Sequence, residues 1–139
     1  SDQHTAKNIV IATGSKPSTL KGVSVDEKVI VTSTGALELN KLPKTMVVIG
    51  AGVIGLEMGS VYGRLGTEIE VIEFAPTLLP TMDGSIGKEM MKILKKEGFK
   101  FQMEHRVLKV ENKGKSVVCA LWFKKSSLKF NIFKNTNNL

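Results

Sequence analysis

No other segment limits the possible folds as strongly as residues 46–59, which read MVVIGAGVIGLEMG. The apolar run that opens this segment is typical of a strand buried on both faces of a parallel sheet. Helical spacing follows from about Val53 to Leu65, and Glu68–Phe74 alternates like a second strand. A strand, a glycine-rich turn, a helix and a strand make a βαβ unit of about 30 residues, which is the usual length. We therefore predict an α/β fold with a Rossmann-like parallel arrangement.

The glycines of this segment form the pattern GxGxxG at Gly50, Gly52 and Gly55. Gly50 would permit the sharp turn, Gly52 would let a pyrophosphate approach the backbone, and Gly55 would let the helix pack closely on the strand. The N–H groups and the dipole of the helix N-terminus would hold the phosphates. A tight turn that binds no ligand is the alternative. Each glycine weakens a helix by up to about 1 kcal/mol, so four of them, with Gly59 included, need a reason. A turn that binds nothing does not provide that reason.

One acidic residue, Glu73, stands at the end of the second predicted strand, where a dinucleotide site needs a carboxylate. It can accept hydrogen bonds from both ribose hydroxyls of an adenosine. It would also repel a 2′-phosphate, and the following residues, Phe74 and Ala75, supply no arginine. The pattern therefore predicts NAD rather than NADP.

The rest of the chain continues the α/β pattern. Residues 7–15, KNIVIATGS, read as a strand, and Asp83 is a plausible N-cap for a helix that ends near Gly98. Residues 99–104, 105–112 and 115–123 look like strands, and we expect them to form a three-stranded antiparallel β extension. In the first helix, Ile54, Met58, Val61 and Leu65 recur at helical spacing. In the helix after Asp83, we expect an apolar core stripe at Ile86, Met90, Ile93 and Leu94.

Charge and composition exclude several other functions. The net charge of +7 comes mainly from residues 114–139, which hold five lysines and no acid. Such a tail could bind nucleic acid or an anionic membrane, but no base-reading motif accompanies it, so we favour a solvated, disordered end and expect neither partner. A single cysteine, Cys119, cannot form an internal disulfide or a zinc cage, and His4 and His105 lack metal-ligand spacing. We therefore expect no metal site.

Five segments resemble one known family in the same order along the chain. They are GAGVIGLEMGSVYGRLG, VIEF, NIVIATGS, VTSTGALEL and FAPTLLPTMDG, within about residues 5–113. They resemble the FAD-dependent pyridine-nucleotide disulfide oxidoreductases, and most closely the branch that oxidises dihydrolipoamide. The resemblance implies NAD and FAD as cofactors, a homodimer, and the lipoyl domain of 2-oxo acid dehydrogenase complexes as partner. It also implies the mitochondrial matrix in a eukaryote and the cytoplasm in a bacterium.

The resemblance also implies roles for individual residues. Ala12, Thr13 and Gly14 match a strand end that touches FAD, Glu73 matches the ribose contact, and Val107 matches a position beside the adenine. Glu57 would lie near the nicotinamide end. The residues that would line the NAD site along the glycine turn are Gly50, Ala51, Gly52, Val53, Ile54, Gly55, Leu56 and Glu57.

The family's redox CxxxxC pair, its first GxGxxG and its catalytic His and Glu have no match here, so we expect an interior piece with no catalytic residue and no activity of its own. We expect residues 1–44 to be the end of an FAD-binding segment, 45–123 an incomplete NAD-binding Rossmann-like domain, and 124–139 an unmatched basic tail. Two alternatives stay open. One is a non-enzymatic NAD-binding module, and the other is a different disulfide reductase, such as glutathione or mercuric reductase, although those prefer NADP.

Overall fold

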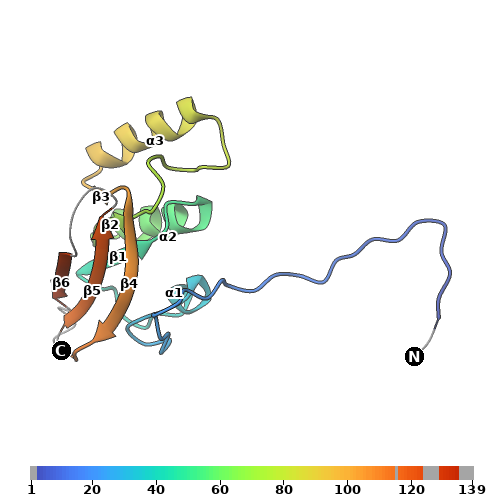
Figure 1. The fold of residues 1–139 in the computed structure, drawn as a ribbon, viewed down its shortest axis with the longest axis horizontal. Coiled ribbons are helices and arrows are strands. Elements are labelled where there is room, and N and C mark those ends of the chain that lie inside the picture. Colours follow the sequence, from blue (N-terminus) through green and yellow to red (C-terminus); the bar gives the residue numbers. More distant parts are fainter. Residues whose placement is uncertain (1–2, 115, 124–128, 135–139) are drawn as a thin grey trace.

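A short parallel sheet lies at the centre of the fold in the computed structural model of the chain (Figure 1). The structure describes residues 3–114, 116–123 and 129–134. β1 (Thr45–Ile49), β2 (Glu68–Ile72) and β3 (Lys100–Gln102) lie in this order, and both of their pairings are parallel. In register, Thr45 pairs with Glu68 and Ile49 with Ile72. The predicted α/β fold with a Rossmann-like parallel sheet is confirmed.

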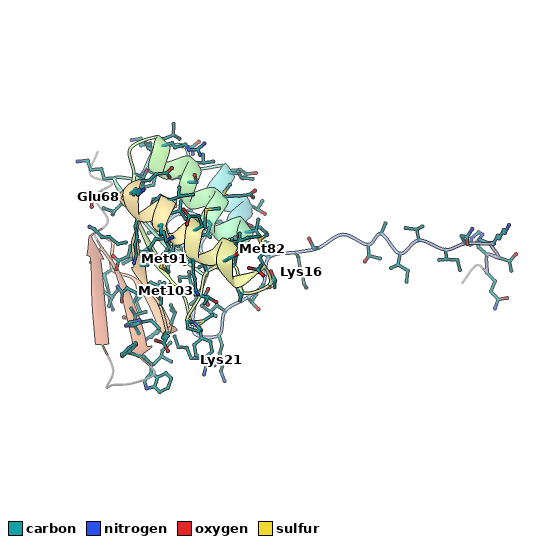
Figure 2. The ribbon with its side chains drawn as sticks, turned by 90° about the horizontal axis from the view of Figure 1, so that it is seen from above. Lys16, Lys21, Glu68, Met82, Met91 and Met103 are labelled. Carbon is teal, nitrogen blue, oxygen red and sulfur yellow. The ribbon has the colours of Figure 1, made fainter. Side chains whose placement is uncertain are left out.

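Two helices connect these strands and pack on one face of the sheet. α2 (Val53–Arg64) joins β1 to β2, and α3 (Gly84–Lys96) joins β2 to β3. α3 begins as expected at Asp83, whose carboxylate accepts a hydrogen bond from the Ser85 N–H at 2.8 Å. Met91 of α3 and Met103, labelled in Figure 2, pack against the core between the helices and the sheet. Of the apolar stripe expected on α3, Leu94 and Met90 meet this core, whereas Ile86 and Ile93 are 48% and 46% exposed. The buried residues of this core are Val48, Ala51, Leu56, Ile69, Val71, Leu78, Leu79, Leu94 and Phe99.

Glycines rather than large apolar residues form the face of α2 that meets the sheet. A Cβ added at Gly59 or Gly63 would lie 3.1 Å or 3.0 Å from the Phe99 ring, so the helix approaches its neighbours closely here. The residues whose spacing predicted this helix therefore do not form its face toward the sheet, although the helix itself is present. Ile54 and Leu65 are both 61% exposed, because the glycines bring the opposite side of the helix to the sheet.

An antiparallel sheet covers the other face of the parallel sheet. β4 (His105–Asn112), β5 (Ser116–Phe123) and β6 (Lys129–Lys134) form a meander, and β5 pairs with both of its neighbours. A second core lies between the layers. Its buried residues are Ile72, Val107, Val110, Cys119 and Leu121.

The membership of this sheet differs from the sequence-based expectation. Residues 100–102 were expected in the antiparallel extension, but they form β3 and pair in parallel with β2. The connection through α3 runs over the helix face and returns the chain in the same direction, which forces a parallel pairing. The third antiparallel strand is β6, which lies in the tail that was expected to be disordered. The rest of that tail lies outside the described residues.

The N-terminal segment departs most from expectation. Residues 3–20 form no helix or strand and extend away from the body (Figure 1). The strand predicted at residues 7–15 is therefore wrong: Ile9, Val10 and Ile11 are 77%, 86% and 85% exposed. Residues 3–20 pair with no strand of either sheet, and an unpaired strand gains neither ladder hydrogen bonds nor burial.

The chain rejoins the body at residues 22 and 23. Val23 forms an isolated bridge with Val110, and the Gly22 carbonyl accepts a hydrogen bond from the Val110 N–H at 3.3 Å. A short helix, α1 (Ser33–Leu37), follows and is capped by the Thr32 side chain. This helix contacts α2 and leads into β1.

Candidate functional site

The candidate site lies at the carboxyl ends of β1 and β2, where parallel α/β sheets bind their ligands. The two strand ends are held side by side, since the Gly50 N–H donates to the Ile72 carbonyl at 2.8 Å. The turn from β1 into α2 and the first residues after β2 therefore meet at one edge of the sheet.

The three glycines of the turn meet three different structural requirements. Gly50 has a φ of +103°, a conformation that residues with a Cβ rarely adopt. A Cβ added at Gly52 would meet nothing within 4 Å, so open space lies in front of this residue. A Cβ at Gly55 would lie 2.4 Å from the Gly50 carbonyl oxygen, so only glycine lets α2 sit this close to the turn.

The N-terminus of α2 faces this open space. Gly52 is the N-cap and provides no side chain to satisfy the first helical N–H groups. The first four N–H groups of a helix have no partner within the helix, and the helix dipole places partial positive charge there. Val53 and Ile54, the first two residues of α2, are 42% and 61% exposed. The arrangement can receive an anion.

The Glu73 carboxylate points toward the glycine turn. One of its oxygens accepts a hydrogen bond from the Ala51 N–H at 2.7 Å, and the other accepts one from the Ala75 N–H at 2.6 Å. The side chain is half-buried. Each carboxylate oxygen has two lone pairs, so each can accept one further hydrogen bond.

The floor beneath the turn comes from the loop between β2 and α3. The Leu79 N–H donates to the Ala51 carbonyl at 3.0 Å, and Ala51 is fully buried. Leu78 and Leu79 are 2% and 5% exposed. An adjacent pair of leucines inside a proline-containing loop is the signal that could have identified these core residues.

The remaining predicted site residues lie in different surroundings. Leu56 is buried in the first core, and Glu57 is exposed on α2. Val107 is 7% exposed and belongs to the second core, so it offers no free side-chain face. Residues 12–14 are exposed in the extended N-terminal segment, away from the turn (Figure 1). The structure thus brings the glycine turn and Glu73 together, but not residues 12–14.

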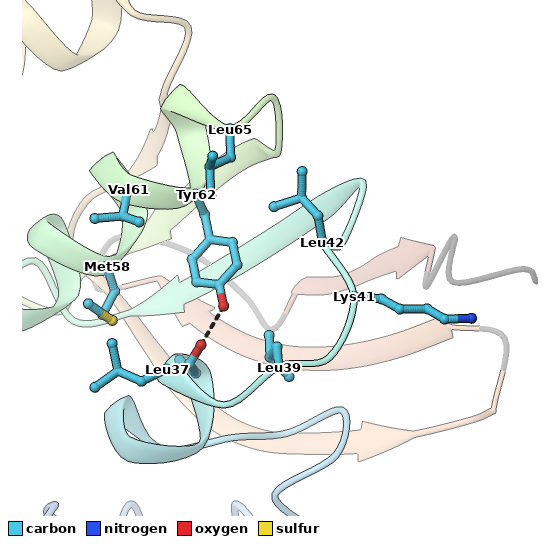
Figure 3. A pocket seen from close by; sticks show the side chains of 9 residues that line it. Leu37, Leu39, Lys41, Leu42, Met58, Val61, Tyr62 and Leu65 are labelled. Atoms are coloured by element: carbon cyan, nitrogen blue, oxygen red, sulfur yellow. Dashed lines mark hydrogen bonds between the residues drawn. The ribbon is translucent and has the colours of Figure 1, made fainter.

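A cavity of about 260 Å³ lies elsewhere, between α1 and the C-terminal half of α2 (Figure 3). Its lining is largely apolar and includes Leu37, Leu42, Met58 and Val61. The Tyr62 hydroxyl donates to the Ala36 carbonyl across it. This cavity contains no part of the glycine turn.

The described residues contain no group of three or more His, Cys, Asp or Glu side chains that could hold a metal ion. The Cys119 thiol is buried, and burial raises its pKa to about 11, so it is a poor nucleophile. Among the helices described, none has the length and apolar character needed to cross a membrane.

A parallel βαβ unit with a glycine turn at the strand ends defines a Rossmann-like α/β protein. Residues 1–131 match the family model described as pyridine nucleotide-disulphide oxidoreductase, and the chain belongs to this family. The match runs past residue 113, where the resemblance found in the sequence analysis ended, and includes β5.

The relatives include several enzymes of known name. Leghemoglobin reductase of Vigna unguiculata is 54% identical over 83% of this chain and 22% of its own length. The mitochondrial dihydrolipoyl dehydrogenase of Pisum sativum is 54% identical over 80% of this chain and 22% of its own length. The chain therefore spans about a fifth of the length of the curated relatives it matches.

Solved structures share the fold. The crystal structure of LpdA from Mycobacterium tuberculosis gives a TM-score of 0.73 at 24% identity, and covers 85% of this chain and 25% of that one. A ferredoxin reductase from Rhodopseudomonas palustris gives a TM-score of 0.56 at 26% identity, and covers 66% of this chain and 22% of that one.

Proposed function

We propose that this chain is the NAD-binding part of a dihydrolipoyl dehydrogenase, the flavoprotein that oxidises protein-bound dihydrolipoamide and passes electrons through FAD to NAD. Relatives of that name are 50% to 54% identical to the chain. The observation that carries the proposal is the Glu73 carboxylate, which is held 2.7 Å from the Ala51 N–H beside an open glycine turn.

The shape of the turn fits the pyrophosphate of a dinucleotide. The space in front of Gly52 meets no protein atom within 4 Å of an added Cβ, so phosphate oxygens can reach the backbone. The N–H groups of Val53, Ile54 and Gly55 would hold them at the helix N-terminus. NAD, when bound, would supply a nicotinamide ring that accepts a hydride.

The chemistry of Glu73 fits the adenosine ribose. The two unused lone pairs of its carboxylate match the 2′- and 3′-hydroxyls, which are both donors. A 2′-phosphate in the same place would meet a negative charge, which favours NAD over NADP. Val107 would lie beside the adenine through its backbone, because its side chain is buried. Glu57 would lie near the nicotinamide end.

The FAD contact at Ala12, Thr13 and Gly14 belongs to the complete enzyme, since these residues are exposed here. We expect the chain alone to be inactive, because its one cysteine cannot form a redox disulfide. In the complete enzyme, the lipoyl domain of a 2-oxo acid dehydrogenase complex would be the partner of a homodimer. A mitochondrial matrix location is supported by relatives named as mitochondrial.

The substitution Gly52→Ser tests the site in the full 139-residue chain. Serine is a better N-cap than glycine, and a Cβ there meets no protein atom, so the melting temperature should stay equal or rise. The added side chain would occupy the space of the phosphates, so NAD affinity should fall at least about tenfold. Calorimetric titration with NAD measures the affinity, and NADP is the reference ligand.

Gly84→Ser is the matched control. Gly84 also has open space for a Cβ, but it lies at the start of α3, away from the turn. This variant should bind NAD like the wild-type chain. Equal NAD binding by wild type and Gly52→Ser, or no NAD binding by the wild-type chain, would contradict the proposed site.

A further inference from the structure

We propose that Arg106 is a cation already in place for a 2′-phosphate at the adenosine end of the site, and that Glu73 alone makes the chain prefer NAD. The inference rests on the proposed function and adds a specificity-determining residue to it. The segment after Glu73 supplies no arginine, but the fold brings one from a different strand.

Backbone hydrogen bonds place the start of β4 beside the end of β2. The His105 N–H donates to the Glu73 carbonyl at 2.9 Å, and the Glu104 N–H donates to the Ala75 carbonyl at 3.3 Å. The residue that follows, Arg106, is thereby fixed next to Phe74. This neighbourhood is set by the backbone and does not depend on the rotamer of a long side chain.

The Arg106 side chain extends over the Phe74 ring. Its guanidinium carbon lies 5.9 Å from the ring centroid, a cation–π distance. Side chains alternate along a strand, so the burial of Val107 in the second core directs Arg106 to the exposed side. Phe74 is itself 55% exposed and directly follows Glu73.

The charge of Arg106 remains available. Among the described residues, Arg106 forms no ion pair, and stacking on a ring does not use its N–H donors. A guanidinium offers the planar, bidentate geometry that phosphate oxygens prefer. Over the residue that follows the ribose carboxylate there is thus a group of opposite preference, which would attract the phosphate that Glu73 repels.

The two groups differ in how directly they act on the ribose. Glu73 would bond the 2′-oxygen itself, so its negative charge has the larger effect on which nucleotide binds. If its charge is removed, Arg106 is the cation that the fold leaves over the next residue, Phe74. One substitution at Glu73 should therefore change the cofactor preference without any new arginine.

The test compares Glu73→Gln with Glu73→Gln/Arg106→Gln in the full chain, by calorimetric titration with NAD and NADP. Glutamine keeps one oxygen acceptor for the turn and removes the charge. Relative to wild type, Glu73→Gln should raise NADP affinity about tenfold and lower NAD affinity. The double variant should lose this gain for NADP while its NAD affinity stays near that of Glu73→Gln.

A charge-matched control is Glu73→Gln/Arg64→Gln, since Arg64, in the last turn of α2, is the other arginine of the chain. It should keep the gain. If the double variant with Arg106→Gln binds NADP as tightly as Glu73→Gln does, the inference is wrong. A wild-type chain that binds neither nucleotide would instead refute the proposed function.

A second pair of variants covers a loss of folding. If circular dichroism shows that Glu73→Gln is unfolded, Glu73→Ser with and without Arg106→Gln gives the same comparison. In either background, the Arg106-dependent part of NADP binding should weaken steeply with salt, because it is an ionic contact. A gain in NADP affinity that is independent of both Arg106 and salt would overturn the assignment.

Discussion

Several carboxylates in the described residues accept hydrogen bonds from backbone N–H groups, and two of them, Glu73 and Asp26, hold a turn or loop in place. Glu73 holds the turn after β1 through Ala51. Asp26 holds a loop before α1, since one of its oxygens accepts from the N–H groups of Lys28, Val29 and Ile30 at 2.8 to 2.9 Å. Partial burial acts to raise the pKa of Asp26, but these hydrogen bonds outweigh it and lower the pKa to about 2.

Substituting Asp26 by alanine should make the chain less stable in a pH-dependent way. At neutral pH we expect the free energy of unfolding to fall by about 1 kcal/mol, a modest value because the site is exposed. The folded pKa of about 2 lies below the ordinary 3.8, so this stabilisation is present above about pH 4 and is lost as pH falls toward 2. Urea unfolding across this range measures the difference between the two chains.

Asp26→Asn is the control for that experiment. It keeps an acceptor oxygen but cannot ionise, so it should retain part of the stability and show no titration of its own. A gap between wild type and Asp26→Ala that stays constant from neutral to acid pH would show that the charged form of Asp26 has no special role.

At the scale of elements, the packing of α2 depends on the absence of side chains. Gly55, Gly59 and Gly63 recur every fourth residue and form the face that meets β1, Ile69 and Phe99. The helix therefore lies close to the sheet, and its N-terminal N–H groups lie next to the end of β1.

The substitution Gly55→Ala should push α2 away from the turn and destabilise the chain. The new Cβ would lie 2.4 Å from the Gly50 carbonyl oxygen, a contact that only backbone movement can relieve. Such overpacking costs about 1–3 kcal/mol, so we expect a clear drop in thermal midpoint together with weaker NAD binding. Gly66→Asn, at a C-terminal turn with a φ of +100° and open space, is the control and should be far milder. A Gly55→Ala chain as stable as wild type would contradict the packing described here.

Local signals made α2, β1 and the N-cap at Asp83 predictable, because each depends on residues within a few positions of one another. Three features depend on distant partners and could not be predicted in this way. β3 joins the parallel sheet because the α3 connection returns the chain in the same direction. Leu79 is buried because its loop lies beneath the turn at Ala51. Arg106 meets Phe74 because the segment after β2 is hydrogen-bonded to the start of β4. For the candidate site, the sequence predicted the glycine turn and Glu73, which the structure brings together, but it did not predict that Arg106 lies over Phe74.

At the scale of the whole molecule, the body buries many of its apolar side chains, whereas the N-terminal segment exposes its own. The body has two cores on either side of one parallel sheet. Residues 3–20 carry apolar side chains into solvent and contribute nothing to either core. An extended apolar segment with unpaired backbone groups is a template for pairing with another chain.

We expect this segment to cause self-association. The apparent mass from light scattering should rise with concentration above the 15.2 kDa of one chain. Ile9→Lys/Ile11→Lys places charges on the segment and should restore a single-chain mass, with NAD affinity unchanged because these residues lie away from the turn. A wild-type chain that stays monomeric at all concentrations would contradict this expectation.

The Leu79 N–H donates a hydrogen bond to the Ala51 carbonyl, so exchange of this one amide proton depends on the glycine turn. Leu79 has a φ of 50°, which a leucine adopts only when its surroundings hold it there. A nucleotide that steadies the Ala51 peptide would also slow exchange of that proton with deuterium, although the proton itself never touches the nucleotide. Deuterium exchange of residues 74–83, measured by mass spectrometry, would then report nucleotide binding without any assay of turnover.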